Sequence, residues 1–447
     1  MQRRNAGFVI LTVLAFLTGV ITLSGVGITR SMTERTVAQQ YAAQQQAFYL
    51  AEAGVDEALF WLRTQAAPPG CPTTPIPPEG CPLTVANVTG TRTASTGTYN
   101  VAITLPPENT NSSIKSYILS VTSNITATNP PIQRTLTYRV KTESFARFAY
   151  FSDSEFPPKS KKRITFTTGD LITGPMHTNG QFGIDGNPVF DGPASSVSSS
   201  LYYDNGGPPN DNPAFNGGLT LGAAAIPLPT VTSTQLQSNA NLVLQGDTSI
   251  ALSGNTMLVT NSANSWVNQP VPISTNGVVF VNGGNLTIAG GEVRGQLTLS
   301  SSQDVLITNS VTYACNPETL LPGYSGQPDP DCLDPSTGQA TRNTDVLGIV
   351  AGQNITLTNA APYDVSLQAS LMALNTSFGF EGADTLQRGT LHIYGGLIQK
   401  NRNTVSSGIG PSTGYRKDYR YDTRFTDLAP PYFPTTGKYQ TVMWQDQ

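Results

Sequence analysis

The feature that most constrains this chain is an uninterrupted apolar run close to its N-terminus. Residues 8–29 form 22 consecutive positions without a charged side chain, enough to cross the apolar core of a bilayer, which is about 30 Å thick. Arg3 and Arg4 precede the run, and cations beside a spanning helix favour the cytoplasmic side. The residues after the run do not resemble the small-residue site at which a secretory signal is cut. The sequence therefore predicts a transmembrane half-helix at 8–29.

The helical pattern continues beyond this run. Residues 30–65 contain no proline and one glycine, Gly54, and are rich in Ala, Gln, Glu and Leu, which favour helix. Apolar side chains recur three, four or seven positions apart, as on one face of an amphipathic helix. They are Tyr41, Phe48, Ala51, Val55, Leu59 and Leu62. Because Pro68 and Pro69 end the pattern, we expect one helix over 8–66, about 87 Å long, whose second half packs against a head domain.

Two short motifs in this region resemble type IV pilins. Gly7 followed by Phe8 resembles the site at which prepilin peptidase removes a leader, and residues 47–59, AFYLAEAGVDEAL, resemble the AEAG signature of PilX-type minor pilins. The resemblance implies a leader at 1–7, a mature N-terminus at Phe8 that can carry an N-methyl group, and contacts with other pilins through the helix. A plain single-pass membrane anchor is the alternative interpretation.

One departure from the pilin pattern bears on position in the pilus. Most pilins carry Glu at the fifth mature position, whereas this chain has Thr12. In pilus and type II secretion systems the subunit without that Glu is usually the one proposed for the tip, because no subunit lies above it. The resemblance therefore implies a subunit at or near the tip.

Three segments after the helix alternate apolar and polar residues, which is typical of strands. They are residues 98–105, 116–127 and 133–142, and turns rich in Pro and Asn separate them. The alternation predicts a sheet. The pilin resemblance implies that this sheet is antiparallel and packs on the second half of the helix, as a pilin-like β head over 67–147.

From about Phe148 the sequence consists of short runs rich in Val, Ile, Leu and Thr, separated by Gly and Asn. Apolar residues alternate within a run and turns recur at short intervals, which favours a parallel β-solenoid whose rungs stack on one another. The period is irregular, so a β-sandwich is an alternative. We expect a large all-β domain over 148–387 and a basic, aromatic closing segment over 388–447, on an α+β pilin-like stem.

Several segments of this second region resemble ComZ-like minor pilins, which carry a β-solenoid on a pilin stem and serve competence pili. They are residues 148–155, 173–184 and 393–402, together with the closing segment. With the N-terminal motifs, the resemblance covers most of the chain.

The four cysteines fall into two local pairs in Pro-rich loops. Three connectivities are possible in principle. Closing a short loop between sequence neighbours needs no long-range geometry, so we predict the disulfides Cys71–Cys81 and Cys315–Cys332, with free thiols as the alternative. Two such bonds indicate an oxidising compartment.

The sequence gives little sign of catalysis. The two histidines, His177 and His392, are far apart, and no His, Cys and Asp cluster has metal-ligand spacing. We expect structural histidines, no metal, no cofactor and no catalytic residue.

Charge is distributed unevenly along the chain. Residues 164–387 carry 2 basic and 16 acidic residues, whereas 388–447 carry 8 basic and 4 acidic residues. A polyanion is repelled by an acidic surface, so nucleic acid is expected at the basic flanks. In the basic flanks, aromatic residues alternate with cations. This combination is typical of proteins that bind single-stranded nucleic acid, in which bases stack on aromatic rings. The candidates are Lys159, Lys161, Lys162, Arg163, Arg416, Lys417, Tyr419, Arg420 and Tyr421. The alternative is a structural closing strand whose tyrosines pack and whose arginines pair with Asp418 and Asp422.

These observations predict a non-enzymatic minor type IV pilin at or near the pilus tip, which captures extracellular DNA for natural transformation. Its partners would be prepilin peptidase, other pilins, the inner membrane before assembly and DNA at the cell surface afterwards. One alternative is a pilus-tip adhesin that binds a surface or carbohydrate. Another is an envelope enzyme on a β-helix, although such enzymes usually cluster acids and bases on one face, and basic residues are scarce here.

Overall fold

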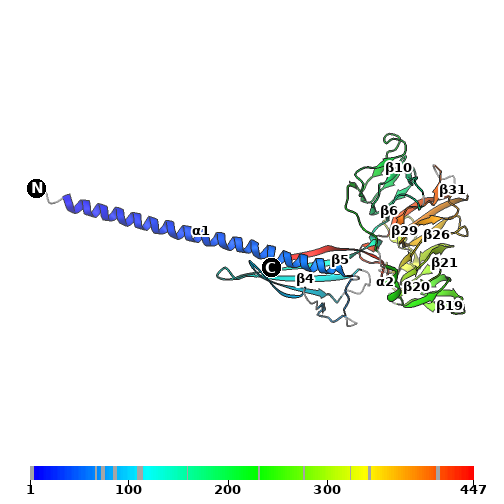
Figure 1. Ribbon diagram of the computed structural model, residues 1–447, viewed down its shortest axis with the longest axis horizontal. Coiled ribbons are helices and arrows are strands. Elements are labelled where there is room, and N and C mark those ends of the chain that lie inside the picture. Colours follow the sequence, from blue (N-terminus) through cyan, green and yellow to red (C-terminus); the bar gives the residue numbers. More distant parts are fainter. Residues whose placement is uncertain are drawn as a thin grey trace. The chain divides into compact units, whose positions relative to one another are not determined.

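The computed structural model describes residues 5–65, 68–71, 76–83, 88–107, 114–158, 160–229, 232–274, 277–322, 324–340, 344–408 and 413–446. The chain divides into two compact units. The first comprises Met1–Asn109, Ser116–Lys141 and Tyr439–Gln447, and the second comprises Thr110–Lys115 and Thr142–Lys438. Figure 1 labels the main helices and strands of both.

The first unit combines one long helix with an antiparallel sheet. Its elements are α1 (Asn5–Thr64), β1 (Cys81–Pro82), β2 (Gly90–Ala94), β3 (Gly97–Leu105), β4 (Ser116–Ile125), β5 (Ile132–Ser144) and β32 (Thr435–Asp446). The strand order is β1-β3-β4-β5-β32, with β2 paired to β3. Strands β3, β4 and β5 pair antiparallel and confirm the three strands predicted from alternation.

Helix α1 changes character along its length. None of residues 8–42 is buried, and among the described residues this is the one helix long and apolar enough to cross a membrane. From Ala43 onward one face is buried against the sheet. That face consists of Ala43, Ala47, Leu50, Ala51, Val55, Ala58 and Leu62. The predicted face began at Tyr41, which is 65% exposed, so the contact with the sheet begins slightly later than expected.

The small residues on this face let helix and sheet approach closely. A Cβ on Gly54 would lie 2.6 Å from Val121 Cγ1 and 2.8 Å from the Tyr99 ring, closer than real Cβ atoms pack. The Ser123 hydroxyl donates a hydrogen bond of 2.7 Å to the Ala47 carbonyl. The glycine of the AEAG motif is therefore required by packing, because any side chain would force α1 away from β4 and β3.

The second unit is inserted into the first. Strand β5 leads into it, and β32 returns to become the last strand of the first unit's sheet. Figure 1 shows this C-terminal strand, in red, beside β5. Residues 439–446 therefore belong to the first sheet, whereas the sequence predicted that they would form part of a closing segment for the second region.

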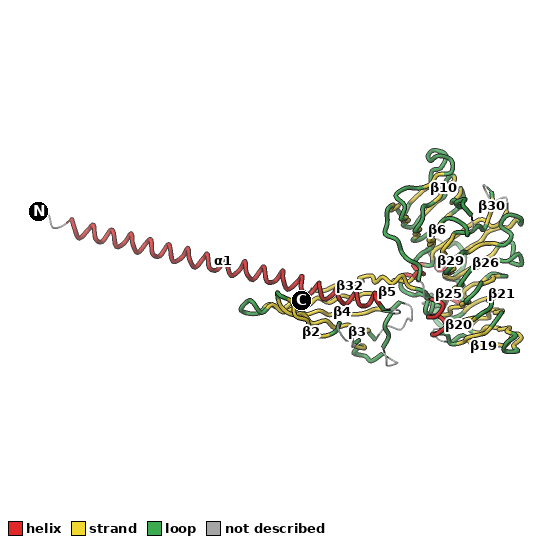
Figure 2. The backbone as a smooth tube through the Cα atoms, viewed as in Figure 1, coloured by secondary structure: helices red, strands yellow, loops and turns green. Residues whose placement is uncertain are grey.

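The second unit is built from short strands joined by many turns (Figure 2). Its strands are β6 (Tyr150–Ser154), β7 (Phe166–Thr167), β8 (Leu171–Ile172), β9 (Met176–Thr178), β10 (Gly183–Asp185), β11 (Val189–Phe190), β12 (Ala194–Ser196), β13 (Tyr202–Tyr203), β14 (Ala214–Phe215), β15 (Leu219–Leu221), β16 (Leu242–Gln245), β17 (Thr248–Gly254), β18 (Thr256–Asn261), β19 (Trp266–Pro272), β20 (Gly277–Asn282), β21 (Leu286–Val293), β22 (Gln296–Ser301), β23 (Val305–Ile307), β24 (Val311–Tyr313), β25 (Val346–Ala351), β26 (Ile355–Leu357), β27 (Val365–Ala373), β28 (Phe378–Phe380), β29 (Gln387–Asn401), β30 (Ser406–Ser407) and β31 (Thr413–Tyr421). Its helices are α2 (Thr232–Ser238) and the 3-10 turns η1 (Phe145–Arg147), η2 (Pro317–Leu320), η3 (Pro330–Cys332) and η4 (Thr423–Thr426).

Parallel pairings arrange these strands in three columns. Column A runs through β16, β20, β22, β25, the second halves of β27 and β29, then β6, β9, β12 and β15. Column C runs through the second halves of β17 and β21, β24, the first halves of β27 and β29, then β31, β8, β11 and β14. Column B runs through the first halves of β17 and β21, then β23, β26 and β28, with β7, β10 and β13 as a separate sheet. A β-sandwich would instead pair its strands antiparallel.

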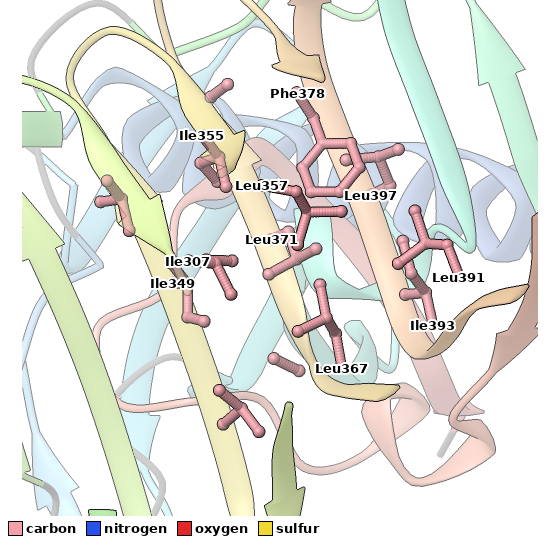
Figure 3. Packing of buried hydrophobic residues seen from close by; sticks show 14 of the residues in the cluster. Ile307, Ile349, Ile355, Leu357, Leu367, Leu371, Phe378, Leu391, Ile393 and Leu397 are labelled. Carbon is pink, nitrogen blue, oxygen red and sulfur yellow. The ribbon is translucent and has the colours of Figure 1, made fainter. Parts of the chain in front are cut away.

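The side chains that point between the columns form one continuous core. Figure 3 draws 14 of them and labels ten, each at most 2% exposed: Ile307, Ile349, Ile355, Leu357, Leu367, Leu371, Phe378, Leu391, Ile393 and Leu397. Fully burying one such side chain contributes about 1.5–3 kcal/mol. Apolar residues alternate with polar ones along the strands because each apolar side chain stacks on an apolar side chain of the next strand in its column. We call one set of consecutive strands, one from each column, a coil.

Column A is also buried on its outer face. Alternate residues of β20 and β25, such as Phe280 and Val350, join a second cluster with Met372, Ile398 and Phe433. This explains why 277–281 and 346–351 are continuous apolar runs rather than alternating ones, as is usual for strands covered on both sides.

Carboxylates close the corners between successive coils. Each accepts a hydrogen bond from a backbone N–H of the adjacent coil. The pairs are Asp247 with Asn285 (2.8 Å), Asp304 with Asn354 (2.8 Å), Asp345 with Gly295 (2.7 Å) and Asp364 with Thr390 (2.7 Å). Much of the acidic excess of residues 164–387 therefore satisfies backbone donors at turns, where an unpaired N–H would be costly.

The order of strands in the stack is not their order in the chain. Strand β6 pairs with β29 in column A, and β8 pairs with β31 in column C. The strands β6–β15 thus extend from one side of β29 and β31, and the strands from β16 to β28 extend from the other. We call the junction formed by these two pairings the seam. Strands β29 and β31, predicted to lie in a separate closing segment from residue 388 onward, instead form the middle of the stack.

Two buried ion pairs join the strands on either side of the seam. Arg402 Nη1 lies 2.9 Å from Glu155 Oε2, with the two side chains 4% and 0% exposed. Arg402 also donates to the carbonyls of Ile164 and Thr165, and its guanidinium lies over the Phe166 ring. The second pair joins Lys417 Nζ and Asp170 Oδ2 at 2.7 Å.

We predict that Glu155→Gln destabilises the protein by about 3–5 kcal/mol, because it leaves the Arg402 charge buried without a counter-charge. The matched control is Glu34→Gln, which breaks the exposed Arg30–Glu34 pair and should change stability little. Denaturant unfolding of the full-length protein in detergent measures both. A loss for Glu155→Gln no larger than that of the control would show that the pair does not hold the seam.

Candidate functional site

Strand β31 separates the aromatic and cationic residues that the sequence interleaves. Successive side chains of a strand point to opposite faces. Tyr415 and Tyr419 are buried, whereas Arg416 and Arg420 are exposed. The rings therefore face the core and the guanidinium groups face outward, so the pattern does not make a stacking surface.

Three DNA-binding candidates of this strand need correction. Tyr419 is 4% exposed and belongs to the core, so it offers no face to a base. Tyr421 packs against both hydrophobic clusters, and burial raises its pKa to about 12. Lys417 is bound to Asp170, and burial lowers the pKa of its ammonium group. The predicted alternative, a structural strand with packed tyrosines, describes these residues better.

The N-terminal basic segment is divided in a similar way. Lys161 and Lys162 are exposed, whereas Lys159 lies outside the described residues. Arg163 is fixed: its guanidinium lies between the Phe156 ring at 4.6 Å and the Tyr202 ring at 5.3 Å, and it donates to the Gln181 carbonyl and side chain.

Glycine makes room for this arginine. A Cβ on Gly183, the β10 residue opposite Tyr202, would lie 2.8 Å from Arg163 Cδ. The absence of a side chain at Gly183 lets Arg163 lie across β10 and reach Gln181. Contacts with Gln181, Phe156 and Tyr202 therefore hold the Arg163 side chain in place, and it cannot move to contact a phosphate.

The structure brings the two predicted basic segments together at one pocket. Lys162, Arg163 and Lys417 all line a cavity of about 450 Å³, which we call the seam pocket. Asp185 and Asp204 line it too. It lies where column B is interrupted, since among the described strands β7, β10 and β13 form a sheet of their own that does not pair with β28. Residues 163 and 417 are far apart in the sequence, so their proximity at this pocket could not be predicted from it.

A second polar cluster surrounds His392 on the outer side of column C. Its Nδ1 lies 2.9 Å from Asp418 Oδ2 and its Nε2 lies 2.8 Å from Glu318 Oε2. Arg420 Nε donates to Asp418 Oδ1 at 3.0 Å, and its Nη1 lies 3.7 Å from Glu318 Oε1. Arg420, a predicted DNA contact, is therefore committed to two carboxylates, which leaves Arg416 as the exposed cation of β31.

This cluster holds a disulfide-closed loop against column C. Cys315–Cys332 and Cys71–Cys81 are both bonded, which confirms the predicted pairing. Glu318 lies in the Cys315–Cys332 loop, and the side chain of Asn316 accepts a hydrogen bond of 2.8 Å from Gln368. His392, expected to be an ordinary structural histidine, thus clamps the loop. Its partners lie 74 and 26 residues away, so the sequence offered no local signal.

Neither cluster points to metal chemistry. In the part of the chain that the structure describes, no group of three or more His, Cys, Asp and Glu side chains is placed to hold a metal ion. The seam pocket and the His392 cluster are arrangements of ion pairs and hydrogen-bonding groups.

We predict a pH-dependent stability carried by His392. Burial alone would lower its pKa, but hydrogen bonds and charge from Asp418 and Glu318 outweigh burial and raise the pKa to about 9. Since the ordinary value is about 6.5, the contribution is fully present below that value and is lost as pH rises through about 9. The stability advantage of the wild type over His392→Gln should shrink by up to about 3 kcal/mol between pH 6 and pH 10.

Denaturant unfolding across that pH range measures the difference, and the subtraction removes titrations that both proteins share. Asp418 and Glu318 accept from the histidine, and Arg420 faces both of them. A pH-independent difference would mean that His392 does not carry a proton between these carboxylates.

The family model of a domain of unknown function, DUF4900, matches residues 116–199, which run from β4 to just beyond β12. No protein of curated function matches the chain. Among solved structures, the crystal structure of the competence-associated pilin ComZ from Thermus thermophilus is 13% identical, with 91% of this chain and 98% of that chain covered and a TM-score of 0.34. At that TM-score the likeness does not establish a shared fold or function.

Proposed function

We propose that this chain is a minor type IV pilin, anchored in the inner membrane by α1 before assembly and displayed at or near the tip of a pilus afterwards. The observation that carries the proposal is the division of α1. None of its residues 8–42 is buried, while the part from Ala43 onward packs under an antiparallel sheet. One continuous helix thus joins the apolar segment 8–29 to the packed part of the first unit.

Residues 8–29 of α1 need an apolar environment. Their large side chains include Phe8, Leu11, Phe16 and Leu23, each more than 70% exposed, and a soluble protein rarely exposes so large an apolar surface. Lipid satisfies this need before assembly, and the helices of other pilins would satisfy it afterwards. Together with the Gly7–Phe8 motif, this supports an assembly role.

The second unit is the displayed part under this proposal. We assign its three parallel columns to the predicted β-solenoid, inserted between the last two strands of the pilin sheet. The proposed role of this unit is binding rather than catalysis, and no cofactor is assigned to it.

Extracellular DNA remains the proposed ligand, with a smaller set of contacts. The exposed cations Lys161, Lys162 and Arg416 are the residues available to phosphates. Among the described residues neither lysine forms an ion pair, and Arg416 makes only a 3.5 Å contact with Thr390 Oγ1. Binding through these groups would be electrostatic and largely independent of sequence.

A tip adhesin is the second candidate, and the seam pocket favours it. Two carboxylates line this pocket beside its cations, and carboxylates disfavour a polyanion. The two roles share one group, because Lys162 lines the pocket and is also one of the three exposed cations.

We expect the mature protein to begin at Phe8. Intact-mass measurement of protein isolated from the envelope should show the loss of residues 1–7, with or without an added methyl group. Gly7→Val should leave the leader attached, because it changes the residue that the pilin resemblance places directly before the cut, whereas Gly19→Val should be processed normally. A start at Met1, or after Thr29, would overturn the pilin assignment.

We expect DNA binding by the full-length protein in detergent to fall steeply with salt. Replacing Lys161, Lys162 and Arg416 by Gln should weaken binding to all sequences alike, and flatten the salt dependence by up to about 0.9 per contact removed for duplex DNA. The control replaces three other exposed cations, Arg35, Arg63 and Lys438, by Gln, with the same change in net charge. Equal effects of the two triple variants would remove the assigned contacts.

A further inference from the structure

The seam pocket has fixed walls. The buried side chain of Arg402 donates hydrogen bonds to the carbonyls of Ile164 and Thr165, which form one wall. The residues that follow Arg402 in the chain, 403–407, form another wall. Lys417 Nζ is held by Asp170 at 2.7 Å. The pocket therefore exists without a ligand, and its volume of about 450 Å³ lies in the range typical of small-molecule sites.

The lining presents hydrogen-bonding groups that the protein does not use. Asp185 accepts one hydrogen bond, from the Asn205 side chain, and Asp204 accepts one, from the Tyr202 hydroxyl. Each carboxylate keeps its second oxygen free among the described residues. Four hydroxyl groups in the lining likewise form no side-chain hydrogen bond within the described part of the chain. They belong to Thr165, Thr167, Thr404 and Ser406.

The charges of the lining do not favour an anion. Lys417 is paired with Asp170. Arg163 donates to the neutral Gln181 and keeps its charge, and Lys162 forms no ion pair among the described residues. Asp185 and Asp204 offset these two positive charges, so a phosphate would meet no net positive charge. An apolar ligand would leave the carboxylates and hydroxyls unpaired at a cost of about 1–3 kcal/mol each.

Tyr202 is not part of the pocket lining, but its ring contacts Arg163 and its hydroxyl contacts Asp204, and both of these residues line the pocket. The Tyr202 ring covers the Arg163 guanidinium with one face and is 40% exposed. Its hydroxyl is tied to Asp204 at 3.1 Å, which fixes the ring. Tyrosine combines an apolar ring with a polar hydroxyl group, so it suits a ligand that has both an apolar face and polar groups.

We propose that the seam pocket binds a neutral saccharide of one or two rings. Sugar hydroxyls would donate to Asp185 and Asp204 and exchange hydrogen bonds with the threonine and serine hydroxyls. The apolar face of a sugar ring would lie against Tyr202. This inference rests on the proposed tip-adhesin function and names the class of its ligand.

The test uses the full-length protein in lipid nanodiscs, because sugar-headed detergents would compete. The probes are the methyl glycosides of glucose, galactose, mannose and N-acetylglucosamine, observed by saturation-transfer NMR and titrated by calorimetry. At least one probe should bind. The double variant Asp185→Asn, Asp204→Asn should lower its affinity at least tenfold, and Tyr202→Ala should do the same. The control is Asp191→Asn, an exposed carboxylate that also accepts one asparagine hydrogen bond, and it should bind as the wild type does.

Two results would overturn the proposal. One is the absence of saturation transfer to all four glycosides, and the other is equal affinity in the wild type and both pocket variants. Displacement of a bound glycoside by deoxyadenosine monophosphate would instead assign the pocket to nucleic acid. The salt titration of DNA binding, run on the same variants, keeps the two functions apart: the pocket variants should retain DNA binding, whereas the variant at Lys161, Lys162 and Arg416 should lose it.

Discussion

The buried pairing of Arg402 with Glu155 is the interaction on which the second unit depends. The strands from β6 to β15 and those from β16 to β28 grow away from the same junction, so without the seam they would be two separate short stacks. Column A and column C supply backbone hydrogen bonds there, but column B is interrupted, and the two ion pairs take the place of its missing pairing. Since a buried charge without its partner is strongly destabilising, the junction forms as a whole. The interruption also leaves the space that becomes the seam pocket.

The first unit depends on a different constraint, which is the close approach of α1 to its sheet. Alanines at 43, 47, 51 and 58 and the glycine at 54 leave little side chain between helix and strands. This places the helix backbone near enough for Ser123 to reach the Ala47 carbonyl. A bulkier helix face would lift α1 away and expose Leu119 and Val121, which are fully buried. Small residues thus determine the half of α1 that stays with the head.

Local patterns predicted local structure well and long-range pairing poorly. The alternation of apolar and polar residues predicted strands β3, β4 and β5. The short loops between neighbouring cysteines predicted both disulfides. The insertion of the second unit before β32 could not be read from the sequence, because the pairing of β5 with β32 is not encoded in either strand alone. The segment 413–421 was the instructive failure. Its tyrosines and arginines alternate with the period of a strand, which sends the two kinds to opposite faces. The residues that suggested a stacking surface therefore lie in the core and on the exterior of β31. The site around His392 depends on register between distant strands and carried no local signal.

The acidic excess of the second unit has a structural cause that changes what it says about ligands. Several of its carboxylates accept backbone N–H groups at corners between coils, as Asp247, Asp304, Asp345 and Asp364 do, and such a role requires an acceptor rather than a negative surface. A count of charges therefore overstates how far this unit was shaped to repel a polyanion. The informative carboxylates are those with an oxygen left over, and Asp185 and Asp204 both line the seam pocket. For this fold, the hydrogen-bonding capacity that remains after the coils are closed is a better guide to the ligand than net charge.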